Sequence, residues 1–324
     1  MGHRYPRDVI YGTSMTSGLR SSRTSHALAS PTGGGLVKIV VTGSRGLLGS
    51  EIMRFFGARE AAIGWSGGGH EGYRRVDITN QKDIDHGLDI DRPDIVIHCA
   101  ANPNVASCEA DPRAARELNA LAVKKITSAT KTRNISLVFI STDYVFSGDK
   151  ESGYAEEDEP SPLQVYGRTK AEGEIYCLDL PGGLVVRLPL LFGIGHVLTK
   201  TTFPEQVVRS LRAGEEVLAD AVEIRQPTLT IDVAEVLYKL VKTRIRGIVH
   251  VAPQQGITKY EWAIYIAERA ALDPSLIRQT RPKQDIRRPL RSWLLDRRLQ
   301  ELQVSPPRIV QASTDAFFHE AELL

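Results

Sequence analysis

Residues 38–57 read KIVVTGSRGLLGSEIMRFFG, and this stretch decides the fold. Four of its first five residues are β-branched, which predicts a short buried strand. Gly43, Gly46 and Gly49 follow at three-residue spacing, and a helical pattern then continues to about Gly57. This order predicts a dinucleotide site, because the turn lets backbone approach a pyrophosphate and the helix N-terminus offers free N–H groups. The alternative is a glycine-rich turn that serves only the packing of helix on strand.

The residues that we expect to bind the cofactor at this turn are Gly43, Arg45, Gly46, Leu47, Leu48 and Gly49. The choice of cofactor rests on the second strand, where NAD-specific proteins place an acid. This chain has Trp65 and Ser66 there. Guanidinium groups from Arg45, Arg74 and Arg75 could hold a 2′-phosphate, so we expect NADPH. NADH stays open if these arginines are only solvated surface charges.

Strands and helices continue to alternate along the chain. Strands are expected over residues 61–65, 94–99, 137–141, 183–188 and 247–251, and helices over 113–130, 162–177, 204–213, 232–243 and 259–271. This alternation predicts an α/β fold, a doubly wound parallel sheet of the Rossmann type. We expect an NAD(P)-binding domain over 37–190 and a smaller C-terminal substrate lobe over 191–324, interleaved with late Rossmann elements.

Residues 1–36 differ from the rest of the chain. They are rich in Ser, Thr, Gly and Arg and show no apolar period, so we expect disorder. They contain no apolar core of a secretory signal. An organelle transit segment is one interpretation. Translated upstream sequence ahead of an alternative start at Val37 is the other, and we prefer it.

Composition limits the partners and the compartment. The 41 basic and 39 acidic residues nearly balance, so neither nucleic acid nor an anionic membrane is expected. Three widely spaced cysteines without CxxC spacing argue against disulfides and zinc and favour a reducing cytoplasm. We expect no metal site, and we interpret the acidic run at 156–159 as a solvated loop.

The sequence YGRTK at 166–170 carries the predicted chemistry. Tyr166 and Lys170 share one helix face, where an ammonium favours the phenolate and lowers its pKa. Such a tyrosine can protonate a carbonyl oxygen while hydride reaches the carbon. Thr142 ends a parallel strand at the edge where open α/β sheets bind ligands, and its hydroxyl could bind the substrate carbonyl. We predict Thr142, Tyr166 and Lys170 as catalytic residues. The alternative is a chance pair on an exposed helix.

Several ordered motifs then identify a resemblance. STDYVFSG at 141–148, VYGRTKAEGE at 165–174, HCAANPNVASCEADP at 98–112 with Asn119, and RQPTLTIDVAEV at 225–236 occur along the chain. From about Val37 onward the sequence resembles dTDP-4-dehydrorhamnose reductases of the extended short-chain dehydrogenase/reductase superfamily. It is equally similar to the regulatory β subunit of methionine adenosyltransferase.

The resemblance implies further site residues. Asp77 and Ile78 would lie by the adenine, and Ala100, Ala101 and Asn102 would pass under the cofactor. The substrate contacts it implies are Thr142, Asp143 and Leu190, with Arg187 beside the sugar pocket. The reductases usually have an aromatic residue where Leu190 stands, so the identity of the sugar stays open.

The implied function is NAD(P)H-dependent reduction of a keto group on a nucleotide-activated deoxysugar by a cytoplasmic enzyme, with a homodimer as one assembly. Two alternatives stay open: a nucleotide-sugar epimerase on the same fold, and a non-catalytic NADP-binding regulatory subunit. We expect His98 in the core and Trp262 on the buried face of its helix. The cluster Arg281, Arg287, Arg288 and Arg291 is either a diphosphate contact or a surface patch.

Overall fold

The computed structural model describes residues 36–195, 201–281 and 285–321. The segment 1–36 that we expected to be disordered lies, apart from Leu36, outside the described residues. Within these three ranges, no helix is long and apolar enough to cross a membrane.

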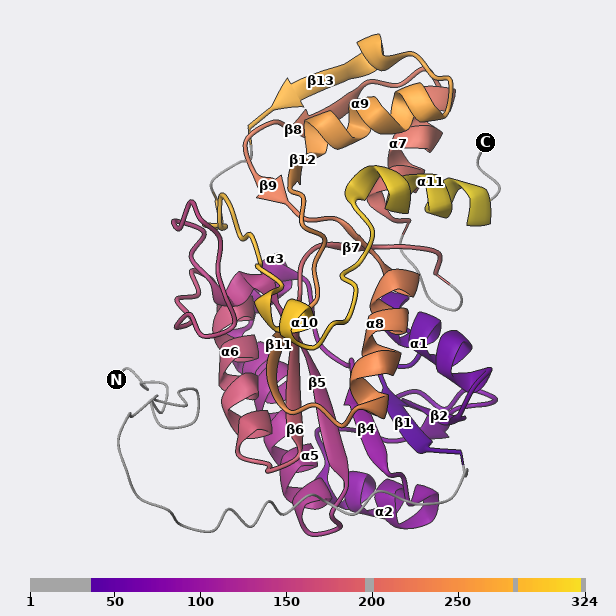
Figure 1. The fold of residues 1–324 in the computed structure, drawn as a ribbon, viewed down its shortest axis with the longest axis vertical. Coiled ribbons are helices and arrows are strands. Elements are labelled where there is room, and N and C mark those ends of the chain that lie inside the picture. Colours follow the sequence, from indigo (N-terminus) through magenta and orange to yellow (C-terminus); the bar gives the residue numbers. More distant parts are fainter. Residues whose placement is uncertain (1–35, 196–200, 282–284, 322–324) are drawn as a thin grey trace.

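A seven-stranded sheet forms the centre of the molecule, with strand order β11-β6-β5-β4-β1-β2-β3 and every pairing parallel (Figure 1). Its strands are β1 (Lys38–Thr42), β2 (Ala61–Ser66), β3 (Arg74–Arg75), β4 (Ile95–His98), β5 (Ser136–Thr142), β6 (Gly183–Leu188) and β11 (Gly247–His250). Starting from β1, the chain winds first to one side and then to the other. The predicted doubly wound sheet is therefore confirmed.

Helices cover both faces because side chains along each strand alternate in direction. Ile39 and Val41 pack toward α1 (Leu47–Gly57) and α8 (Thr230–Lys242). Val40 between them packs in the cluster under α2 (Gln81–Asp91), α5 (Ala122–Lys131) and α6 (Val165–Leu178). Strands apolar on both faces are characteristic of a parallel sheet buried between helical layers.

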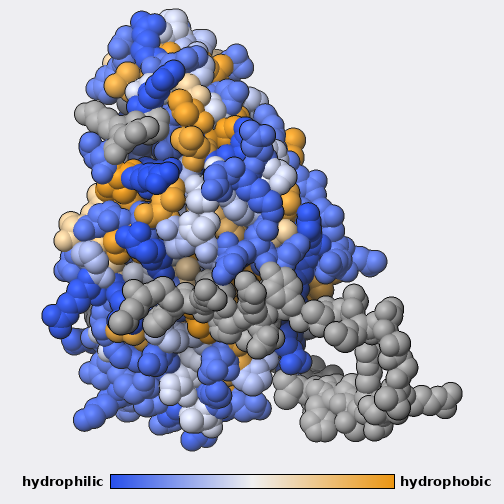
Figure 2. All heavy atoms as spheres, turned by 90° about the vertical axis from the view of Figure 1, so that its left-hand side faces the viewer, coloured by the Kyte–Doolittle hydropathy of each residue, from blue (hydrophilic) through white to orange (hydrophobic). Residues whose placement is uncertain are grey.

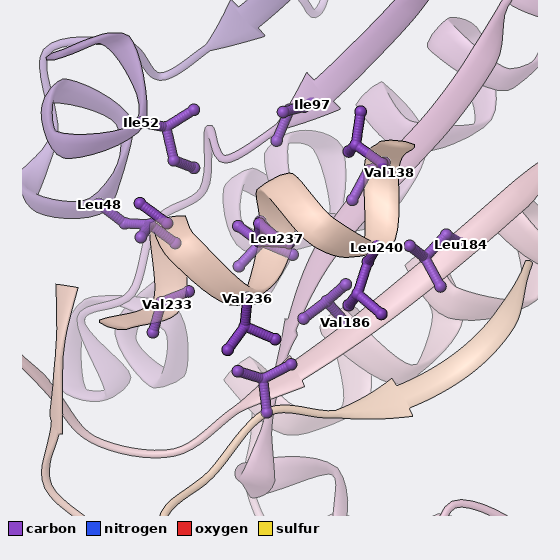
Figure 3. Packing of buried hydrophobic residues seen from close by; sticks show 14 of the residues in the cluster. Leu48, Ile52, Ile97, Val138, Leu184, Val186, Val233, Val236, Leu237 and Leu240 are labelled. Carbon is purple, nitrogen blue, oxygen red and sulfur yellow. The ribbon is translucent and has the colours of Figure 1, made fainter. Parts of the chain in front are cut away.

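Helix α8 shows how the late part of the chain completes the sheet. Leu237 and Leu240 are fully buried, and Figure 3 shows them pointing toward the strands that carry Val138 and Val186. Strand β11 then pairs with β6, aligning Ile248 with Val185. Helix α8 and strand β11 therefore pack on and extend the central sheet.

The C-terminal lobe has its own core. Trp262 is fully buried, and the rings of Phe192 and Phe203 pack edge-on or tilted within 5.1 Å of its ring. Thr258 caps the helix of Trp262 through a capping box with Glu261. The elements of this part are β7 (Leu191–Phe192), α7 (Phe203–Arg212), β8 (Val217–Asp220), β9 (Ile224–Arg225), β10 (Thr228–Leu229), β12 (Ile257–Thr258), α9 (Lys259–Arg269), β13 (Ile277–Thr280), α10 (Arg297–Glu301) and α11 (Val310–Glu320). On the face shown in Figure 2, hydrophobic residues gather in the upper half, toward this lobe.

Two predicted helices differ in the structure. The helix expected over 113–130 consists of α4 (Pro112–Arg116), a π-helical turn (Glu117–Leu121) and α5, and it is preceded by a separate short helix, α3 (Val105–Ala110). Asp111 ends α3 and caps α4 with its carboxylate, so the chain breaks there. The helix expected from Pro162 begins at Val165, because Gln164 is still extended.

Leu237→Ala should lower the free energy of unfolding by about 2–5 kcal/mol, because it removes a buried side chain between α8 and the sheet. Ile90→Ala on α2 is the control, since Ile90 is 49% exposed and should change stability by less than about 0.5 kcal/mol. Urea unfolding measures both variants. Equal losses would contradict this account of the core.

Candidate active site

A cleft of about 840 Å³ opens at the carboxyl ends of β1, β4, β5 and β6. It contains the predicted catalytic and substrate residues and part of the predicted cofactor set: Gly43, Gly46, Leu47, Leu48, Gly49, Ala100, Ala101, Thr142, Asp143, Tyr166, Lys170 and Leu190. An adjoining pocket of about 390 Å³ shares Gly43, Gly46 and Ala100 and adds Arg45, Asp77 and Ile78. Residues predicted from six separate stretches of sequence therefore line one continuous site.

The glycine turn has the shape that a phosphate cradle needs. Gly43 has a φ of +63°, and a Cβ there would lie 2.7 Å from the backbone of Ala100. The N-cap of α1, Gly46, offers no side-chain cap, and the first turn carries no acidic residue. The N–H of Gly46 donates to Gly43 O at 2.9 Å. The next backbone N–H groups, in the first turn of the helix, lack an acceptor within it, and the helix dipole there favours an anion. The residues present fit the pyrophosphate of a dinucleotide.

The three predicted arginines have different surroundings. Arg45 lines the adjoining pocket, and its Nε is buried without a hydrogen-bond partner in the described part of the chain. Arg74 instead forms an ion pair at 2.6 Å with Asp91, which also accepts a hydrogen bond from Trp65 Nε1. Arg74 thus fastens β3 to α2, and the expectation that it faces a phosphate is wrong. Arg75 is exposed and does not line the pocket.

Thr142 is tied to its neighbour at the end of β5. Its hydroxyl donates to Asp143 Oδ1 at 3.0 Å and accepts from the backbone N–H of Tyr144 at 3.2 Å. Burial raises the pKa of Asp143, against the lowering effect of Arg225 nearby. A threonine hydroxyl has one proton, so here the Thr142 oxygen is left to accept from other groups.

Tyr166 and Lys170 lie on one face of α6, but their electrostatics differ from the prediction. Burial raises the pKa of Tyr166, and the hydrogen bond with Thr142 lowers it less. Lys170 Nζ donates to Ile140 O at 2.6 Å and lies 4.0 Å from the centre of the Phe139 ring. Burial lowers the pKa of Lys170 to about 7. The ammonium is therefore directed at β5, and the predicted lowering of the Tyr166 pKa by Lys170 is not found here.

Arg187 does not border the sugar pocket as expected. It is fully buried on β6 and forms two hydrogen bonds to Glu174 on α6, at 2.9 and 2.8 Å. Glu174 also accepts from Ser141 Oγ at 2.5 Å. A buried guanidinium needs a carboxylate partner, and that partner lies behind the cleft rather than in it.

The acidic run at 156–159 is solvated only in part, because Glu157 and Glu159 are exposed whereas Glu156 is buried. Glu156 is buried and accepts from the backbone N–H groups of His250 and Arg298, each at 3.2 Å. Burial raises its pKa. Asp158 forms an ion pair with Lys150 at 2.6 Å. The run joins the first domain to the C-terminal segment.

Asn102 lies beside the cleft and is held by Asn119. Its backbone N–H donates to Asn119 Oδ1 at 2.8 Å, and Asn119 Nδ2 donates to Asn102 O at 3.2 Å. The π-helical turn brings the buried Asn119 side chain to this position. π-Turns often occur at functional sites, yet nothing in the residue spacing distinguishes one from a regular helix.

Three cationic side chains lie together at the far end of the cleft. Their spacing in the sequence did not predict this grouping. Arg225, Lys259 and Arg288 line the cleft with Glu223, which pairs with Arg225 at 2.5 Å. Of the predicted arginine cluster, only Arg288 lines this cleft within the described residues. His98, as expected, is a buried residue whose Nδ1 lies 2.7 Å from Thr42 Oγ1.

Comparisons with known proteins agree with this arrangement. The model of the RmlD substrate binding domain matches residues 37–322. A probable low-salt glycan biosynthesis reductase of Haloferax volcanii is 34% identical, over 73% of this chain and 81% of its own. Methionine adenosyltransferase 2 subunit beta of Rattus norvegicus is 31% identical, over 74% of each chain. The crystal structure of dTDP-4-dehydrorhamnose reductase from Bacillus anthracis in complex with NADP superposes with a TM-score of 0.81 at 26% identity, covering 88% of this chain and 99% of the other.

Arg187→Met should lower the free energy of unfolding by about 3–5 kcal/mol, because Glu174 then keeps a buried charge without its ion-pair partner. The double variant Arg187→Met with Glu174→Gln should regain part of that loss. Arg278→Ala, which breaks the exposed pair with Glu216, should cost less than about 1 kcal/mol. Chemical denaturation measures the three, and a loss for Arg187→Met no larger than for Arg278→Ala would contradict the ion pair's structural role.

Proposed function

The chain belongs to the RmlD substrate-binding domain family, and on that premise we propose that it is an NAD(P)H-dependent reductase of a keto group on a nucleotide-activated deoxysugar. The observation that carries the proposal is that Thr142, Tyr166 and Lys170 line the same cleft as the glycine turn. A fold alone would not indicate this chemistry, since one fold hosts many functions. A proton donor beside a turn that fits a dinucleotide does indicate this chemistry.

In this proposal the residues of the two adjoining pockets would hold the cofactor. The turn from Gly43 to Gly49 and the N-terminus of α1 receive the pyrophosphate, and Asp77 and Ile78 border the adenine. The bound reduced cofactor supplies a hydride to the carbonyl carbon. The loop 100–102 would border the cofactor, and Lys170 would hold its ribose.

NADPH is the preferred form within this proposal. The buried Nε of Arg45 has no partner in the described structure and lies in the pocket with Ser66, where NAD-specific proteins carry an acid. A guanidinium bonds a phosphate with strong, charge-assisted hydrogen bonds. The absence of an acid at Ser66 also removes a group that would repel a 2′-phosphate.

Tyr166 supplies the proton. Because burial raises its pKa, the phenol keeps its proton at neutral pH and can pass it to the carbonyl oxygen as hydride reaches the carbon. The product is an alcohol, and Tyr166 is left as a phenolate that must regain a proton before the next turnover. Thr142 and Asp143 position the oxygen that is protonated.

The anionic part of the substrate belongs at the opposite end of the cleft. Arg225, Lys259 and Arg288 supply the positive charge that a nucleotide diphosphate requires. Leu190, half-buried at the border of the cleft, would contact the sugar through an aliphatic side chain. This combination supports a nucleotide-linked sugar, rather than a free sugar, as the substrate.

The proposal includes a cytoplasmic location and a homodimer. All three cysteines are free, and Cys108 and Cys177 are buried, which suits a reducing compartment. Leu218 and Leu290, 69% and 55% exposed on the C-terminal lobe, are candidates for a contact between copies. Light scattering of the purified protein tests the dimer, and a monomer mass would reject it.

A second candidate function is a non-catalytic regulatory one, which the name of the Rattus norvegicus relative suggests. Its 31% identity is close to that of the Haloferax volcanii reductase, so sequence similarity does not separate the two. Turnover separates them, because a regulatory subunit would bind NADPH without oxidising it in the presence of a keto sugar.

With NADPH and a dTDP-4-keto-6-deoxysugar, the protein should oxidise the cofactor, and Tyr166→Phe should lower kcat about 10²–10⁴-fold because it removes the proton donor. Absorbance of reduced nicotinamide measures the rate. Tyr265→Phe, which loses a hydroxyl bonded to Asp315 in the lobe, is the matched control and should keep its rate. No oxidation across a panel of such sugars would reject the reductase. Sugar conversion without net oxidation would favour the epimerase.

Arg45→Ala should raise KM for NADPH by about 10–100-fold and leave KM for NADH nearly unchanged, because charge-assisted hydrogen bonds contribute about 1.5–3 kcal/mol. Arg75→Ala, which changes an exposed arginine outside the pocket, is the control. Steady-state kinetics with both cofactors measures the ratio. An equal rise for NADPH and NADH would show that Arg45 does not read the 2′-phosphate.

A further inference from the structure

A segment from the C-terminal part of the chain crosses the edge of the cleft. We name residues 289–296 the strap. Leu290 O accepts from Ile224 N at 2.9 Å in the lobe, whereas Tyr154 exchanges two backbone hydrogen bonds with Trp293 O and Leu295 N, at 2.7 and 2.8 Å. The strap is therefore fixed on the lobe at one end and on the first domain at the other.

Ser292 lies between these two attachments and contacts Asp143, a residue of the cleft. It is 3% exposed, and its Oγ donates a short hydrogen bond to Asp143 Oδ2. The other carboxylate oxygen, Oδ1, accepts from Thr142 Oγ1 at 3.0 Å. Both oxygens of Asp143 are thus occupied by hydroxyl donors, one from β5 and one from the strap.

This double attachment fixes more than the carboxylate. Because the single Thr142 proton is directed at Asp143 and one lone pair accepts from the Tyr144 N–H, the remaining lone pair of the Thr142 oxygen is available to Tyr166. If Asp143 rotated, Thr142 would be free to turn its proton elsewhere. The orientation of the Thr142 hydroxyl therefore depends on Ser292, which is separated from Asp143 by 149 positions in the sequence.

We propose that Ser292 is a positioning residue for the reduction: it holds Asp143 so that Thr142 presents its oxygen to Tyr166. This inference rests on the proposed function for its link to turnover. Ser292 itself does not line the cleft, and it acts through Asp143 rather than on the substrate. Arg288, four residues earlier and lining the cleft, places this arrangement next to the proposed diphosphate end.

The charges around Asp143 fix the direction of the expected pH effect. Arg225 from β9 lowers the pKa of Asp143, as do the hydroxyls of Ser292 and Thr142, while burial raises it. The Asp143 charge also raises the pKa of Tyr166 and of Tyr144. Among the other charges on this side of the cleft, Glu223 raises the pKa of Tyr144 and Arg288 lowers it. Removing the Ser292 hydroxyl takes away a bond to the charged form, so the pKa of Asp143 must rise. The charged form is the stronger acceptor for the Thr142 hydroxyl. On acidification, we therefore expect the variant to lose activity at a higher pH than the unaltered protein does.

Ser292→Ala tests the proposal, with Ser292→Thr as the rescue variant. The matched control is Ser313→Ala, which removes another buried serine hydroxyl that donates to a carboxylate, Asp232 Oδ2 at 3.1 Å, away from the cleft. We expect Ser292→Ala to lower kcat about 10-fold or more, because about 10-fold corresponds to the weakest hydrogen bonds made to a charged group. KM should change less than about 2-fold. The acidic limb of the kcat profile should move to higher pH, and Ser292→Thr should restore both.

Two results would overturn the proposal. One is a Ser292→Ala variant that loses stability like Ser313→Ala but keeps kcat and the pH profile of the unaltered protein. The other is an equal shift of the profile in both alanine variants. A direct titration of the Asp143 carboxyl by carbon-13 NMR needs no turnover, and a rise in its pKa is expected in Ser292→Ala alone. If the unaltered protein oxidises no NADPH, the proposed function fails, and an unchanged Asp143 titration then separately rejects the role of Ser292.

Discussion

The buried ion pair between Arg187 and Glu174 is the interaction on which the site depends. Glu174 stands four residues after Lys170 and eight after Tyr166, so the three share one face of α6. Arg187 on β6 and Ser141 on β5 both donate to Glu174, which fixes the helix against two adjacent strands. Because Ser141 directly precedes Thr142, the same contact sets the distance between the helix and the strand end where the reaction is proposed.

Local sequence pattern predicted much of the fold and the glycine turn that lines the cleft. The β-branched runs became the strands of a parallel sheet, and the glycine turn between strand and helix lies in the cleft. These predictions succeed because strand, turn and helix are determined by residues a few positions apart. The helix predicted over 113–130 failed in detail, since a π-turn differs from an α-turn by one residue and leaves the apolar period almost unchanged.

The interactions that sequence did not predict join distant segments. Arg74 and Arg45 are the same residue type near the same pocket, yet Arg74 has Asp91 as its partner and Arg45 Nε has none among the described residues. Glu156 looked like part of a charged loop, and only the fold brings the backbone of His250 to it. Whether a polar group is structural or free to bind a ligand depends on partners that no local spacing specifies.

The strap and α8 also determine what a recombined protein must contain. The C-terminal part supplies Leu237 and Leu299 to the core under the sheet and β11 to its edge, while the strap pairs with Tyr154 of the first domain. The two halves are therefore not exchangeable modules, unlike domains that are joined only by a linker. A chimera that borrows the sugar-binding half of a relative must also carry over α8, β11 and the strap, and the residues facing them must be matched.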